Sequence, residues 1–132
     1  MTYHLSRTVA LPFDAAIAAT TDSLKRHGFG VLTEIDVQAT LKKKLDVAFR
    51  PYRILGACNP QFAYKALQEE DKIGTMLPCN VVIQQRDGGK VEISAVDPVA
   101  SMQAVGNPKL AAVAEQVRSM LRQAVEDIAP AA

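Results

Sequence analysis

Residues 78–96 read PCNVVIQQRDGGKVEISAV and contain the clearest β-hairpin signal in the chain. An apolar run at residues 81–83 is followed by the polar segment 86–90, whose Asp-Gly-Gly core tolerates positive φ angles. Residues 91–96 then alternate apolar and polar side chains, which is typical of a strand with one buried face. The stretch therefore predicts two antiparallel, neighbouring strands.

Further strands and helices are expected on both sides of this hairpin. Period-two alternation predicts strands near residues 3–9 and 29–37, and a third strand is expected at 53–58. Helical spacing of apolar residues predicts one long helix from residue 13 to about 27, and another of about five turns after residue 108. Shorter helices are expected after Asn59-Pro60 and Asp97-Pro98, because both pairs are typical helix starts. Residues 40–45 fit only one helical turn.

This order of elements predicts an α+β fold. The sequence reads β-α-β-β-α-β-β-α, which favours a mostly antiparallel sheet of about five strands backed by two long helices. A length of 132 residues with 48% hydrophobic side chains suits one domain with a single core. We therefore expect one domain over residues 1–129 and a frayed tail at 130–132.

Composition excludes several classes of partner. Lys and Arg number 15 against 14 Asp and Glu, so no nucleic-acid partner is expected. No run approaches the ~20 apolar residues that span a bilayer, and the first residues lack a secretory signal. We expect a cytoplasmic protein with no membrane partner. Two cysteines are too few for a disulfide framework.

The two cysteines are the most informative candidates for a functional site. Cys58 directly precedes the helix start at Asn59, where unpaired backbone N–H groups favour a thiolate. Cys79 begins the first strand of the hairpin, so the two sulfur atoms meet at one end of the sheet if their strands are neighbours. Three interpretations stay open: small buried apolar residues, a redox pair, or a soft-metal site.

Carboxylates and polar residues complete the set of candidates. Glu34 and Asp36 lie two positions apart on a predicted strand, so both carboxylates point to the same side. They either perform acid–base chemistry or belong to a solvated strand face. We expect Asp36 to join the cysteines at one rim of the sheet. Glu34 is expected to line a cleft there, as are Asn59, Tyr52 and Met102.

Three segments together resemble a known family. FGVLTEIDV (residues 29–37), YRILGACNP (52–60) and LPCNVVI (77–83) occur in this order, and the chain is similar over nearly its whole length to the domain-of-unknown-function family numbered 302. The resemblance implies a compact α+β domain of the TATA-box-binding-protein-like class and a homodimer. It implies no reaction and no catalytic residues, and the fold class by itself gives no reason to expect DNA binding.

Three hypotheses for function follow. The first is a small-ligand or soft-metal-binding module with its site at Cys58, Cys79 and Asp36. The second is a thiol redox enzyme or sensor that uses Cys58 as nucleophile and Cys79 as resolving thiol. The third is a structural or interaction dimer without a small-molecule site. No motif identifies an enzymatic reaction or a cofactor.

Overall fold

A five-stranded antiparallel sheet organises residues 2–129, the part of the chain that the computed structural model describes. Its strands are β1 (His4–Val9), β2 (Gly30–Asp36), β3 (Tyr52–Cys58), β4 (Cys79–Gln85) and β5 (Val91–Val96). They lie in the order β1-β5-β4-β3-β2, and every neighbouring pair is antiparallel. The predicted α+β class is confirmed. The tail expected at 130–132 falls outside the described residues.

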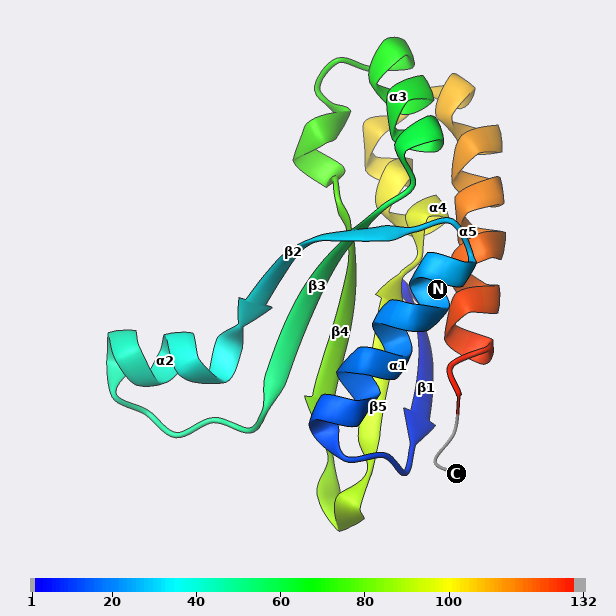
Figure 1. Cartoon of the computed structure of the whole chain (residues 1–132). Coiled ribbons are helices and arrows are strands. Elements are labelled where there is room, and N and C mark those ends of the chain that lie inside the picture. Colours follow the sequence, from blue (N-terminus) through cyan, green and yellow to red (C-terminus); the bar gives the residue numbers. More distant parts are fainter. Residues whose placement is uncertain (1, 130–132) are drawn as a thin grey trace.

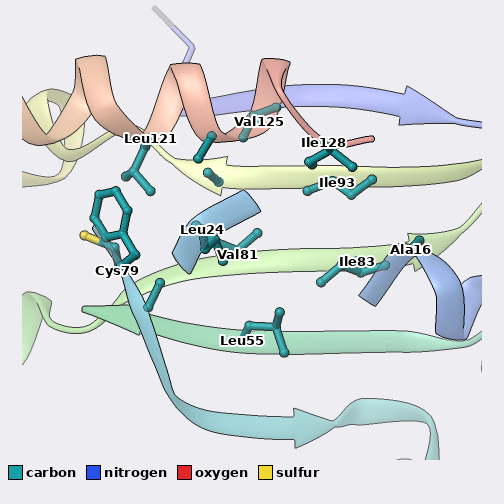
Figure 2. Packing of buried hydrophobic residues seen from close by; sticks show 14 of the residues in the cluster. Ala16, Leu24, Leu55, Cys79, Val81, Ile83, Ile93, Leu121, Val125 and Ile128 are labelled. Atoms are coloured by element: carbon teal, nitrogen blue, oxygen red, sulfur yellow. The ribbon is translucent and has the colours of Figure 1, made fainter. Parts of the chain in front are cut away.

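Two long helices cover one face of this sheet. Both α1 (Phe13–Arg26) and α5 (Ala111–Glu126) pack on the same side, as Figure 1 shows. The core between helices and sheet consists of side chains that are almost completely buried, among them Leu24, Leu55, Val81, Ile83, Ile93 and Leu121. In Figure 2, Cys79 lies at one end of this core, and Ile83 and Ile93 lie toward the other end.

The hairpin expected at residues 78–96 is present. Strands β4 and β5 pair in register from Val81 opposite Ala95 to Gln85 opposite Val91. The turn requires positive φ at Gly88 and Gly89, a conformation that side chains rarely tolerate.

Shorter helices gather beyond the ends of β3 and β4. They are α3 (Pro60–Glu69) and α4 (Pro98–Met102), with short 3₁₀ turns at Ile73–Met76 and Pro108–Leu110. The expected caps are present: Asn59 accepts from the backbone of Phe62 at 3.2 Å, and Asp97 accepts from Val99 at 2.9 Å. These helices and the start of α5 form the top of the molecule in Figure 1.

One helix is longer than the sequence predicted. Residues 37–45 form α2 (Val37–Leu45), where only a single turn was expected. Asp36 starts this helix by accepting a hydrogen bond from the backbone N–H of Ala39 at 2.9 Å, and Asp46 ends it in a left-handed conformation at φ 52°. Helix α2 and the end of β2 project away from the body of the molecule (Figure 1). We call residues 30–47 the β2–α2 arm.

A helix that crosses a bilayer must be both long and apolar. No helix within residues 2–129 meets both conditions.

Candidate functional site

Strand pairing brings the two cysteines to the same end of the sheet. Cys58 is the last residue of β3 and Cys79 is the first residue of β4, where Ala57 lies directly opposite Cys79. Given a strand spacing of about 4.8 Å and a rise of about 3.3 Å per residue, the Cα atoms of the two cysteines are roughly 6 Å apart. Cys58 is half-buried and Cys79 is buried, and both are free thiols.

Both cysteines line one small cavity. Cys58, the last residue of β3 directly before α3, lines this cavity together with Cys79. Met102, the last residue of α4, lines the cavity as a third sulfur-bearing residue, and we call it the sulfur cavity. Most of its remaining wall is apolar and comes from Phe29, Phe62, Leu77, Leu110, Val113 and Val117.

The volume of the sulfur cavity limits what it can hold. It measures about 50 Å³. Pockets for drug-sized ligands occupy roughly 300–1,000 Å³, whereas one probe-sized water needs about 10–15 Å³. The cavity therefore suits an occupant of one to a few heavy atoms.

Burial alters the acidity of Cys79. It raises the pKa of this thiol from an ordinary 9.0 to about 11, and a negative charge on neighbouring Cys58 contributes a smaller part of the increase. Charge is disfavoured because the surrounding side chains cannot solvate a thiolate as water does. Cys79 is therefore a neutral thiol at physiological pH. The dependence on Cys58 also indicates that the two thiols are close enough to interact.

Asn59 fixes the position of Cys58. Its side-chain oxygen caps α3, while its amide nitrogen donates to the carbonyl of Gly28 at 3.1 Å. One side chain thus joins the start of α3 to the turn between α1 and β2. Asn59 lines the sulfur cavity, and these contacts give it a structural role there.

The structure does not bring Asp36 and Glu34 to the cysteines. Asp36 pairs with Arg53 across β2 and β3, five positions along β3 from Cys58, or about 17 Å at the usual strand rise. Arg53 binds both carboxylates, with its Nη1 at 2.6 Å from Glu34 and its Nη2 at 3.4 Å from Asp36. The expected convergence of Asp36 with the thiols is therefore corrected: both carboxylates take part in an ion-pair cluster at the opposite end of the strand.

Tyr52 lies in a different depression. It lines a broad groove of about 420 Å³ on the face of the sheet that α1 and α5 leave uncovered. Polar side chains in and beside this groove bind one another: Arg50 Nη2 donates to Gln84 at 2.9 Å, and Arg86 Nη2 donates to Glu92 at 3.1 Å. The groove is therefore separate from the sulfur cavity, and Tyr52 does not belong with the cysteines.

The amino-acid sequence did not predict the apolar wall of the cavity. Its residues come from strand ends, loops and three helices, so no local pattern groups them. One local signal was available at Gly56, a glycine inside a strand, which often marks a close approach. A Cβ atom at this position would lie 2.7 Å from Pro78 Cγ and would overlap the hydroxyl of Thr33. The contact packs the segment before β4 tightly against β3, beside the two cysteines.

Within residues 2–129, no group of three or more His, Cys, Asp or Glu side chains could hold a metal ion, whether hard or soft. The polar chemistry of the sulfur cavity is therefore mainly that of two thiols and a thioether.

These features define a small α+β protein with an antiparallel sheet, helices on one face and a sulfur-lined apolar cavity at the end of the central strands. The model of the family described as "Domain of unknown function DUF302" matches residues 5–128, and the chain belongs to this family. A solved structure described as an uncharacterized conserved DUF302 protein from Bacillus stearothermophilus is similar, with a TM-score of 0.90 and 29% sequence identity. The similarity covers 98% of this chain and 100% of that one. A comparison with curated proteins found no match.

Proposed function

We propose that this protein is a binding module for a very small ligand, either an apolar molecule or a soft metal ion, and that its site is the sulfur cavity. The observation that carries this proposal is the joint placement of Cys58, Cys79 and Met102 in the wall of one apolar cavity. Concave apolar space with a few polar or polarisable groups is where small ligands bind.

The chemistry of Cys79 favours binding over thiol catalysis. A resolving thiol attacks as a thiolate. With a pKa of about 11, only about one Cys79 side chain in ten thousand is ionised at pH 7. The redox alternative therefore lacks a reactive second thiol.

Xenon tests the cavity as a binding site, because it is apolar, monatomic and able to enter apolar cavities. We expect backbone amide NMR signals of residues around the cavity to shift as xenon pressure rises. Ala63→Leu places extra atoms in the cavity wall on α3 and should abolish these shifts. Gln61→Leu adds the same side chain on an exposed position of the same helix and should preserve them.

The outcomes separate clearly once thermal unfolding shows that both variants are folded. Saturable shifts confined to the cavity, lost in Ala63→Leu and kept in Gln61→Leu, support the proposal. Identical shifts in both variants contradict it, and so does the absence of shifts in an unaltered protein that also binds no soft metal ion.

We also propose that two copies associate through the β2–α2 arm, a second candidate favoured by a specific feature of that arm. Strand β2 is at the edge of the sheet, so one side of its backbone is left for pairing with another strand. Large apolar side chains are exposed along the arm: Leu32, Ile35, Leu45 and Val47. An antiparallel pairing of β2 with β2 of a second copy would cover both features.

Sedimentation equilibrium tests this association. Ile35→Lys and Leu45→Lys should each shift the protein toward the monomer, while Leu67→Lys, at an exposed apolar position on α3, should not. A monomeric unaltered protein, or a dimer insensitive to both arm variants, contradicts the proposal.

A further inference from the structure

We propose that the ligand of the sulfur cavity is monovalent copper, held by the thiolate sulfurs of Cys58 and Cys79 and by the thioether sulfur of Met102. The inference rests on the proposed function of the cavity as a ligand site and names the class of that ligand. It assigns a role to Met102, which no local sequence pattern connects to the cysteines.

The first argument is the identity of the donors. Three residues with soft sulfur atoms line one cavity, and they come from three separate elements: β3, β4 and α4. Soft thiolate and thioether ligands select Cu(I) over hard ions, which prefer oxygen ligands. Carboxylates are absent from the wall of this cavity, because Glu34 and Asp36 are bound to Arg53 elsewhere.

The second argument is the number of donors. Structural zinc sites have four protein ligands, and catalytic zinc sites have three ligands plus a water molecule. Zinc ligands are drawn from Cys, His and carboxylates, and the cavity offers only two of these side chains, the two cysteines. Two thiolates and a thioether are therefore a better match for Cu(I) than for Zn(II).

The third argument is the size and polarity of the space. A cavity of about 50 Å³ is large enough for a single ion. Its wall is mostly apolar and includes Phe29 and Phe62, so it offers few nitrogen or oxygen ligands. This favours the monovalent state, because the divalent ion prefers nitrogen and oxygen ligands in a tetragonal arrangement.

Binding is coupled to the release of protons. Each thiol gives up its proton when its sulfur binds Cu⁺, so two S–H bonds are replaced by two Cu–S bonds and two protons enter the solvent; no electron is transferred.

The experiment is an anaerobic competition for Cu(I) between the reduced protein and a chromophoric Cu(I) chelator. We expect the unaltered protein to withdraw one equivalent of copper. Cys58→Ala and Cys79→Ala should each lower the affinity by at least about 100-fold, since loss of even an outer-shell partner costs 10–100-fold. Met102→Leu preserves the apolar packing and should weaken binding about tenfold. Met76→Leu, at an exposed methionine outside the cavity, is the matched control and should change nothing.

X-ray absorption supplies a second readout that does not depend on affinity. The copper should have a coordination shell of three sulfur atoms in the unaltered protein and of two in Met102→Leu. A shell containing nitrogen or oxygen, or one unchanged by Met102→Leu, overturns the assignment of these donors.

The xenon experiment separates failure of this inference from failure of the proposed function. If xenon enters the cavity but copper is not withdrawn, or copper binding survives both cysteine variants, the copper assignment is wrong and the cavity is still a ligand site. If neither xenon nor copper enters, both proposals fail.

Discussion

Raising the pH should destabilise the protein through Cys79, and the size of the effect follows from the burial of this thiol. Its pKa is about 11 in the folded protein, against about 9.0 for an unhindered thiol. As the pH increases, the unfolded chain therefore loses this proton before the folded protein does. Below pH 9 the thiol is neutral in both states, and the folded protein has its full stability. Stability is lost progressively between pH 9 and 11, and the total loss is about 3 kcal/mol.

The assay is urea denaturation of the reduced protein at half-unit steps from pH 7 to 10.5, for the unaltered chain and for Cys79→Ala. Other groups titrate in this range, so the informative quantity is the difference in unfolding free energy between the two proteins. We expect this difference to be nearly constant below pH 8.5 and to fall by about 1 kcal/mol per pH unit between pH 9 and 10.5.

Cys58→Ala is the matched control for this experiment. Because burial is the larger cause of the raised pKa and Cys58 the smaller, this variant should retain most of the pH dependence. A difference between the unaltered protein and Cys79→Ala that stays flat up to pH 10.5 would refute the burial of Cys79 as described.

Three further predictions concern contacts that hold the site and the fold. Gly56→Ala should lower the unfolding free energy measured in urea by about 1–3 kcal/mol, because the new methyl group overlaps its neighbours. Adding Thr33→Ala should recover part of this loss, since it removes the overlapping hydroxyl. Arg7→Met should lower stability by about 1–3 kcal/mol, because Nη1 of Arg7 donates to three carbonyls at the end of α5; unchanged thermal unfolding would contradict this role. Asn59→Ala removes the cap of α3 and should lower the unfolding free energy by about 1–2 kcal/mol. It should also increase amide hydrogen exchange at the start of α3. An unchanged exchange pattern there would contradict the capping role of Asn59.

The sequence predicted local structure well where one short signal decides it. The hairpin at residues 78–96 follows from the apolar run and the Asp-Gly-Gly turn, and α3 follows from the cap Asn59 and Pro60. Helix α2 was underestimated because its lysine-rich stretch has little apolar periodicity. Its start depends on Asp36, which was interpreted as a site residue and acts as a helix cap.

The site itself could be predicted only in part. Neighbouring strands place Cys58 and Cys79 at the same end of the sheet, and a strand-and-hairpin interpretation of the sequence allows this arrangement. The apolar–polar alternation of β2 does not show which end of this strand lies beside the cysteines. Asp36 was therefore expected near them, although it lies about 17 Å away along the strand. Met102 reaches the cavity because α4 packs against α5, and such contacts between distant segments leave no local pattern.

The most direct test of the sulfur cavity measures whether a change at Cys58 affects the side chain of Met102. Methyl methanethiosulfonate should add a methylthio group to the half-buried Cys58 in preference to the buried Cys79. With ¹³C-labelled methionine methyl groups, this addition should shift the Met102 signal and leave that of exposed Met76 in place. A Met102 signal that does not move after Cys58 is fully modified would contradict the shared cavity.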